Sequence, residues 1–267
     1  MRLIDALDLN RGERLACVGA GGKTTLCWRA WSELRAASRL PIFTTTTHIL
    51  EPILPPGTAL YLARAWDRCQ LSALAQTVSA LVAAAHRLPE PFADFVPNPI
   101  APARPFKLAG PGPEQIDDAF DALAEATWIV EADGARGRGL KWPADHEPSI
   151  PSRTTTVAVL ACLDVIGQRL SDGFVHRPER LGRRIGLEPG SLLSADHVAR
   201  VMNDPSGGLK GVPAGARAIG VLNQSDAAGP HPDADAIVER LLMSGSYARV
   251  VVASLRADQP VLGVHTA

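Results

Sequence analysis

A glycine-rich segment near the start of the chain has the residue types of a phosphate-binding loop. Glycines let backbone N–H groups turn inward around a phosphate, and the start of a following helix adds partial positive charge. We expect Lys23 to reach the β- and γ-phosphates of a nucleoside triphosphate and the Thr24 hydroxyl to bind Mg²⁺. The residues expected to contact the nucleotide here are Gly19, Ala20, Gly21, Gly22, Lys23, Thr24 and Thr25.

The spacing of this loop departs from the strict Walker A motif, because Cys17 stands where that motif has its first glycine. The shorter form Gly-x-x-Gly-Lys-Thr-Thr is similar to the loop of Mur-type ligases. A glycine-rich turn with a solvated lysine would contain the same residues. The order of apolar run, loop and helical pattern favours phosphate binding.

Two polar segments could supply the metal side of such a site. Glu131 and Asp133 end an apolar run, and the two-residue period of a strand places them on the same face. Carboxylates at such a strand end hold Mg²⁺ directly or through water, so we expect Asp133 to be a ligand and Lys23, Glu131 and Asp133 to be the catalytic groups. Four threonines precede His48, and Thr47 is a further candidate for Mg²⁺, although threonines also suit a strand by propensity alone.

The polar element Asn223-Gln224-Ser225-Asp226 follows an apolar run late in the chain. It is similar to the Asn-Lys-x-Asp element with which GTPases read guanine, with Gln224 in place of the lysine. Asp226 would accept hydrogen bonds from guanine, and Asn223 would also lie at the nucleotide. Because an altered element of this kind equally suits adenine, the sequence predicts ATP or GTP without choosing between them.

A basic, glycine-rich segment follows the acidic strand at residues 134–139. Such a loop could move over the nucleotide or grip a second anionic substrate, and a solvated surface loop is the alternative. The residues expected to contact a substrate or partner lie in this segment, just after it, and in the block His-Arg-Pro-Glu; they are Arg136, Arg138, Lys141, His146, Glu147, His176, Arg177 and Glu179.

The elements that must position these residues alternate between apolar runs and helical patterns. The predicted strands are residues 14–20, 41–49, 59–63, 106–110, 127–135, 154–167, 217–226 and 248–255, and the predicted helices are 24–37, 66–88, 115–126, 192–203 and 233–243. Strands separated by helices imply a parallel sheet with helices on both faces. We therefore expect an α/β, P-loop NTPase-like, doubly wound single domain over residues 1–267, with a proline-rich insertion near 89–113.

The composition of the 267-residue chain indicates a folded protein, with 46% hydrophobic and 21% charged residues. Its net charge of -1 gives no electrostatic reason to bind nucleic acid. Charges throughout the first 22 residues and the absence of a run of eighteen apolar residues predict neither a signal peptide nor a membrane partner. The four cysteines lack metal-ligand spacing and predict reduced thiols in the cytoplasm, with Cys17 and Cys162 as core residues.

The chain resembles the YqeC family in five blocks that follow the family order: residues 18–26, 44–49, 130–151, 163–179 and 221–226. Members of that family are described as accessory proteins of selenium-dependent molybdenum hydroxylases. The resemblance implies a P-loop NTPase-like fold and a role in maturing such a hydroxylase or its cofactor. It carries over Lys23, Thr24, Glu131, Asp133, Lys141, His146, Glu147, His176, Arg177 and Glu179 as family-typical residues. No cysteine placed to handle selenium is visible in the sequence.

Three functional hypotheses follow. The first is an accessory protein that binds ATP or GTP with Mg²⁺ and uses hydrolysis, or the nucleotide state, to assist assembly of a molybdenum hydroxylase. The second is a Mur-ligase-like or kinase-like enzyme that phosphorylates a small acceptor, and the third is a nucleotide-binding scaffold without hydrolysis. The expected partner is the hydroxylase or a cofactor-maturation protein. Since nucleotide-switch proteins often act as symmetric dimers, a second copy of the chain is a further candidate partner, in a homodimer.

Overall fold

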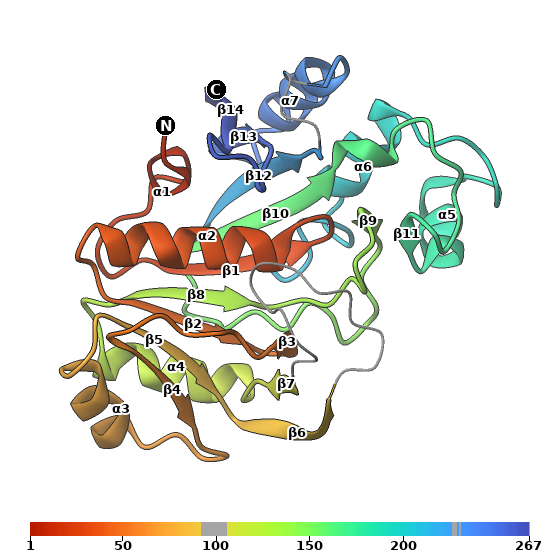
Figure 1. Ribbon diagram of the computed structural model, residues 1–267. Helices are drawn as coiled ribbons and strands as arrows, with labels where there is room; N and C mark the ends of the chain where they lie inside the picture. Colours follow the sequence, from red (N-terminus) through yellow and green to blue (C-terminus); the bar gives the residue numbers. More distant parts are fainter. Residues whose placement is uncertain (92–105, 226–228, 230, 267) are drawn as a thin grey trace.

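A nine-stranded, mostly parallel sheet forms the centre of the computed structural model, which describes residues 1–91, 106–225, 229 and 231–266 (Figure 1). The pairing at one edge is antiparallel, and the other pairings in this sheet are parallel. The fold is therefore α/β, as predicted. In spatial order the strands are β14 (Val261–Thr266), β13 (Arg249–Ala253), β12 (Arg217–Asn223), β10 (Thr156–Cys162), β1 (Arg14–Gly19), β8 (Thr127–Glu131), β2 (Pro41–Thr45), β5 (Ala80–Ala84) and β4 (Thr58–Leu62).

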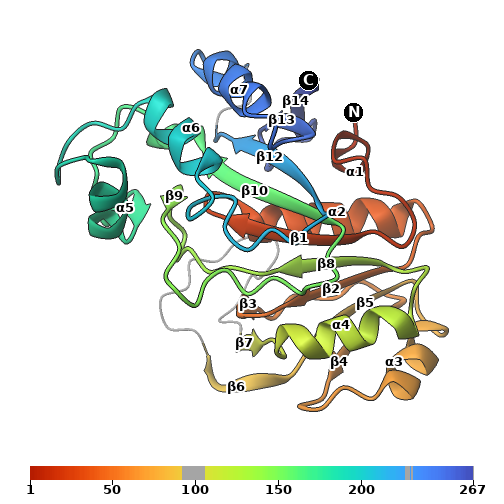
Figure 2. The same ribbon diagram turned by 180° about the vertical axis from the view of Figure 1, so that it is seen from behind.

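Helices cover both faces of this sheet (Figures 1 and 2). One face carries α1 (Leu3–Ala6) and α2 (Lys23–Ala36), and the other carries α3 (Arg68–Ala75), α4 (Pro113–Ala122), α6 (Ala195–Asn203) and α7 (Ala234–Met243). Along β1, Leu15 and Cys17 pack on the α2 side, whereas Ala16 and Val18 pack on the opposite side. Because both faces are buried, the central strands form nearly continuous apolar runs in the sequence.

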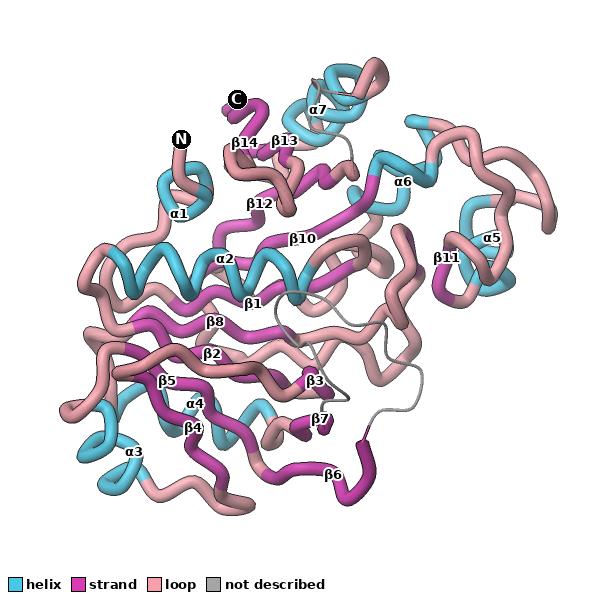
Figure 3. Tube along the Cα trace, viewed as in Figure 1, coloured by secondary structure: helices cyan, strands magenta, loops and turns pink. Residues whose placement is uncertain are grey.

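Smaller elements lie beyond the carboxyl ends of the central strands (Figure 3). A three-stranded antiparallel sheet contains β3 (His48–Leu50), β7 (Phe106–Ala109) and β6 (His86–Pro91), and the strand expected at 106–110 is thereby confirmed. A second small sheet pairs β9 (Leu140–Lys141) with β11 (Val175–His176) in parallel. The chain continues from β11 into α5 (Pro178–Ile185).

Two of the predicted elements are only partly correct. The helix expected over residues 66–88 ends at Ala75, and the apolar run Ala80–Ala84 is instead the buried strand β5. A short apolar run buried on both faces has no periodicity that separates helix from strand. The strand expected over 41–49 ends at Thr45, because the Thr45 hydroxyl accepts a hydrogen bond from the backbone N–H of Thr47 at 2.9 Å and the chain turns there.

Several other predictions hold with shorter boundaries. The helix α6 begins after Ser194, whose hydroxyl accepts from the backbone N–H of His197 as a capping residue.

The edge strand β14 and the helix α5 have no counterpart among the predicted elements. Of the proline-rich insertion, residues 92–105 lie outside the described part. No helix in the described part is long and apolar enough to cross a bilayer.

The strand order places the carboxyl end of β1 at a topological switch point. The chain passes from β1 to β2, β4 and β5 on one side, and only later to β10, β12 and β13 on the other. Open α/β sheets bind ligands outside the carboxyl ends of their strands at such a point. The loop after β1 is therefore where this architecture favours a ligand.

Candidate functional site

The loop between β1 and α2 has a backbone that requires glycine. Gly19, Gly21 and Gly22 have φ angles of 87°, 80° and 125°. A Cβ atom on Gly21 would lie 2.5 Å from the Cβ of Cys162, and one on Gly22 would lie 2.8 Å from the side-chain nitrogen of Asn223. The tight turn and its close neighbours explain the glycines at this end of β1.

The same loop presents unpaired hydrogen-bond donors. In the part of the chain that the structure describes, the backbone N–H groups of residues 21–25 donate to no acceptor. They lie at the start of α2, where the helix dipole adds partial positive charge. The Lys23 side chain folds back over the loop, and its Nζ donates to the carbonyl oxygen of Gly19 at 2.7 Å. This arrangement is a cradle for an anion.

Thr24 and Glu131 meet beside this cradle. The Thr24 hydroxyl lies 2.9 Å and 3.1 Å from the two carboxylate oxygens of Glu131, which is 6% exposed at the end of β8. Burial raises the pKa of Glu131 to about 7, against the opposing effects of the Lys23 charge and the Thr24 hydrogen bond. A hydroxyl and a carboxylate are oxygen ligands that suit Mg²⁺. Among the described residues, no group of three or more His, Cys, Asp or Glu side chains could hold a metal ion.

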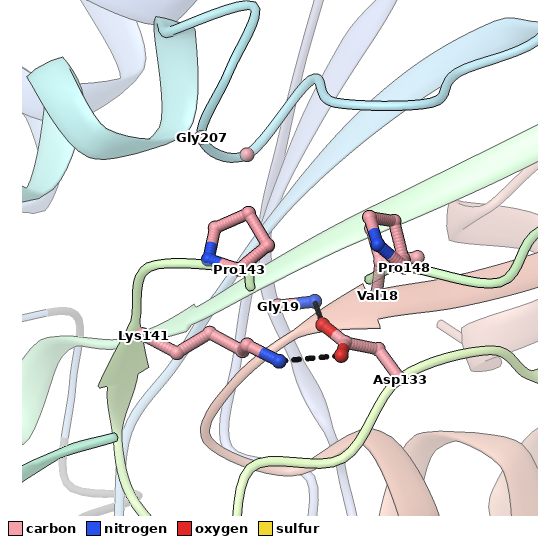
Figure 4. A pocket seen from close by; sticks show the side chains of 8 residues that line it. Val18, Gly19, Asp133, Lys141, Pro143, Pro148 and Gly207 are labelled. Carbon is pink, nitrogen blue, oxygen red and sulfur yellow. Dashed lines mark hydrogen bonds and ion pairs between the residues drawn. The ribbon is translucent and has the colours of Figure 1, made fainter. Parts of the chain in front are cut away.

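Asp133 fastens the phosphate loop from the side of β8. One carboxylate oxygen accepts from the backbone N–H of Gly19 at 3.1 Å, and the other accepts from Nζ of Lys141 (Figure 4). Glu131 and Asp133 both contact the phosphate-loop segment, although β8 ends at Glu131 and Asp133 lies beyond the strand whose two-residue period would align them. Both oxygens of Asp133 are thus bonded to the protein itself.

Lys141 is buried and occupied within the protein, although the sequence makes it a candidate for contact with a substrate. Its Nζ donates to Asp133, to the carbonyl oxygen of Gly134 at 2.7 Å and to Glu147 at 2.9 Å. An ammonium group has three protons, and all three are used. A cavity of about 20 Å³ beside it, which residues including Gly19 and Pro148 line, has room for about one water molecule.

Glu147 connects Lys141 to the start of α5. Arg177 donates to both of its carboxylate oxygens, at 2.5 Å and 3.0 Å, and the backbone N–H of Ala144 donates at 3.1 Å. Burial alone would raise the pKa of Glu147, but the hydrogen bonds from Arg177 and Lys141 hold it well below its usual range. The ion network of Asp133, Lys141, Glu147 and Arg177 therefore ties the phosphate loop to β9 and α5.

The other substrate candidates lie around this network. The His146 side chain is 80% exposed and its ring lies 3.8 Å from Glu147, while Glu179 is exposed in the first turn of α5. His176 pairs with Lys141 across β9 and β11. Burial, together with the charges of Arg177 and Lys141, lowers the pKa of His176 to about 4, so its ring is neutral near pH 7.

The sequence also predicts three residues after neighbouring strands, and Asn223 is the one that contacts the phosphate loop in the described part of the chain. Asn223 donates to the carbonyl oxygen of Gly21 at 2.8 Å and accepts from the backbone N–H of Leu255 at 3.1 Å, so it joins the phosphate loop to the segment after β13. The Thr47 hydroxyl lies 3.1 Å from that of Thr45, which donates to the carbonyl oxygen of Glu131 at 2.7 Å. Asp226 lies outside the described residues.

Two residues lie at the site although the sequence does not predict them there. Cys162, expected in the core, is half-buried at the end of β10 and its Cβ abuts Gly21. Asp164 accepts from the backbone N–H of Ser225 at 3.1 Å and steadies the polar element after β12. The signal for both is their position at the carboxyl end of β10 or just after it, because β10 is a neighbour of β1.

The family model described as "YqeC protein" matches residues 15–179 of the chain. The chain belongs to the YqeC family. The matched stretch contains the phosphate loop, the acidic end of β8 and the whole ion network, whereas Asn223 lies beyond it. A relative from Escherichia coli (strain K12), described as "Uncharacterized protein YqeC", is 29% identical over 227 residues, which are 82% of this chain and 79% of that relative.

Proposed function

We propose that this YqeC-family protein binds a nucleoside triphosphate, ATP or GTP, together with Mg²⁺ at the loop after β1, as a P-loop NTPase-like protein. The observation that carries the proposal is the row of N–H groups at residues 21–25 that have no acceptor among the described residues, set around the buried ammonium group of Lys23. A polyphosphate would satisfy these donors and neutralise the positive charge of both the helix start and the lysine.

The residues around the loop have separate roles in this proposal. Lys23 would exchange the Gly19 carbonyl for a phosphate oxygen, and Thr24 with Glu131 would hold Mg²⁺, with Thr47 and Asp133 as further candidates from neighbouring strand ends. The bound ion would supply charge neutralisation at the phosphates. Asp133 also acts as a positioning residue, because it holds the N–H of Gly19 in place.

Calorimetric titration of ATP and GTP, each with and without Mg²⁺, tests this proposal. The variant Lys23→Met should lose about 1.5–3 kcal/mol of binding free energy, the range for a hydrogen bond to a charged group, which is roughly a 10- to 100-fold weaker affinity. The matched control is Lys210→Met, because the Lys210 ammonium group donates to the backbone carbonyls of Ala144 and Asp145. Equal affinities of the Lys23 variant and the wild type would refute nucleotide binding at this loop.

The proposed biological role is assistance in the maturation of a selenium-dependent molybdenum hydroxylase or its cofactor. This role is what the resemblance to the YqeC family implies, and the chain belongs to that family. Hydroxylase activity in cells that lack this protein should return with the wild type and with Lys210→Met, but not with Lys23→Met. Unchanged hydroxylase activity without the protein would exclude the role. Phosphate release from ATP and GTP separates a hydrolysing protein from a scaffold.

A further inference from the structure

We propose that the loop between β8 and β9 forms a second anion-binding subsite, in which Arg136 and Arg138 take the carboxylate or phosphate group of a second small molecule beside the nucleotide. The subsite deepens the proposed function and rests on it for the nucleotide neighbour. It also assigns a ligand class to two arginines that the ion network of Lys141 leaves out.

The loop that carries the two arginines lies directly against the phosphate loop. The carbonyl oxygen of Gly139 accepts from the backbone N–H of Cys162 at 2.8 Å, and a Cβ atom on Gly21 would lie 3.0 Å from that same oxygen. The backbones of Gly21 and Gly139 are therefore in close approach. Arg138 immediately precedes Gly139, so its backbone lies next to the phosphate loop.

Both ends of the arginine loop are fixed. Lys141 donates to the carbonyl oxygen of Gly134 at 2.7 Å, and the backbone N–H of Gly139 donates to the carbonyl oxygen of Phe174 at 3.0 Å. Between them a tight turn is closed by the N–H of Arg138, which donates to the carbonyl oxygen of Ala135 at 2.9 Å. A loop that is held in this way pays less ordering entropy when it binds a ligand.

The backbone at Arg136 is unusual for its residue type. Its φ angle is 48°, and that of Gly137 is 72°, so both central residues of the turn are left-handed. Such turns favour asparagine or glycine at the position that Arg136 occupies, because a Cβ atom is disfavoured there. Strained residues of this kind cluster at ligand-binding sites.

The positive charge of these arginines is not compensated in the described part of the chain. Neither guanidinium group has a hydrogen bond or an ion pair there, whereas Lys141 and Arg177 are bonded to Asp133 and Glu147. The neighbouring carboxylates are thus already neutralised by other cations. A guanidinium group offers a planar pair of donors that matches a carboxylate or a phosphate.

His176 borders the proposed subsite on the β11 side. It pairs with Lys141 in the small parallel sheet, and Arg136 is among the charges that lower its pKa, after burial, Arg177 and Lys141. A neutral imidazole can donate and accept a hydrogen bond without adding charge. It is therefore suited to orient an uncharged polar group of the ligand whose anionic group the arginines bind.

The test is a calorimetric titration of inorganic phosphate and, separately, of succinate into the full chain saturated with Mg²⁺ and a non-hydrolysable ATP or GTP analogue, which fills the phosphate loop. The variant Arg136→Gln/Arg138→Gln should bind at least tenfold more weakly than the wild type. The matched control Arg64→Gln/Arg68→Gln removes the same charge from two exposed arginines near β4 and α3 and should bind like the wild type. The anion that binds more tightly identifies the chemical source.

Failure of both phosphate and succinate to bind the wild type, or equal binding of the tighter anion by the wild type and the Arg136/Arg138 variant, would overturn the subsite. Failure of both analogues to bind would instead count against the proposed function. In that case the same titrations with the Lys23→Met chain, which lacks the ammonium group of the phosphate loop, decide the subsite by the same tenfold criterion. The two proposals can therefore fail separately.

Discussion

Replacement of Glu131 by glutamine tests the electrostatics of the phosphate loop, because burial raises the pKa of this carboxyl group to about 7 from 4.5. A carboxyl group with a higher pKa in the folded than in the unfolded state binds more protons when folded, so its contribution to stability falls as pH rises between the two values. The difference between the folded and unfolded pKa values of Glu131 corresponds to about 3 kcal/mol of folding stability. Between pH 5 and pH 7.5, the linkage relation predicts that the free energy of unfolding falls by about 2 kcal/mol because of this group.

Urea unfolding of the wild type and Glu131→Gln at both pH values measures this loss. Glutamine keeps the size of the side chain and an acceptor for the Thr24 hydroxyl, but it cannot ionise. The free energy of unfolding of the wild type, relative to the variant, should fall by about 2 kcal/mol from pH 5 to pH 7.5. Taking the difference cancels groups that titrate in both proteins, such as His176.

A difference between the two proteins that stays constant to within about 0.5 kcal/mol, the usual scatter of such comparisons, would refute the reasoning. Glu131 would then titrate at its ordinary value in spite of its burial. A rise in the relative stability of the wild type with pH would contradict the sign of the argument, because it would mean that Lys23 and Thr24 outweigh the cost of burial.

Three further perturbations probe the ion network and the loop. Lys141→Met leaves two carboxylates of the network without their lysine and should cost about 3–5 kcal/mol in urea unfolding, against about 1 kcal/mol for Lys210→Met; equal losses would contradict the network. Gly21→Ala should abolish nucleotide binding and lower the thermal midpoint, and an unchanged titration would show that the loop can relax. Because the folded pKa of Glu147 is depressed, the stability advantage of the wild type over Glu147→Gln should be present above about pH 4.5 and fade as pH falls; a constant advantage would exclude this origin.

The sequence predicts the α/β class because apolar strands alternate with helical patterns, and it places the phosphate loop between the correct elements. It does not predict β5, since a run such as Ala80–Ala84 is apolar at every position and gives no period. The sequence does not predict the strand order either, because the two neighbours of β1 lie more than a hundred residues away from it along the chain.

The candidate site, like the fold, is predicted only in part by the sequence. The sequence groups Glu131 and Asp133 with the phosphate loop, but β8 ends at Glu131, and only the packed structure shows that Thr24 pairs with Glu131 and the Gly19 backbone with Asp133. Lys141 looks like a substrate-binding residue beside two arginines in a glycine-rich segment. Its burial follows from the pairing of β9 with β11, which no local pattern reveals.

The insertion of β8 between β1 and β2 has a consequence for synthesis on the ribosome. Although α2 joins β1 directly to β2, the two strands are not neighbours, and both partners of β1 come late, at residues 127–131 and 156–162. A growing chain therefore carries β1 with both edges open until β8 and β10 emerge, and open apolar edges are prone to mispairing. The phosphate loop is among the first segments to leave the ribosome, yet its backbone can reach its final shape only after Asp133 and Asn223 have arrived.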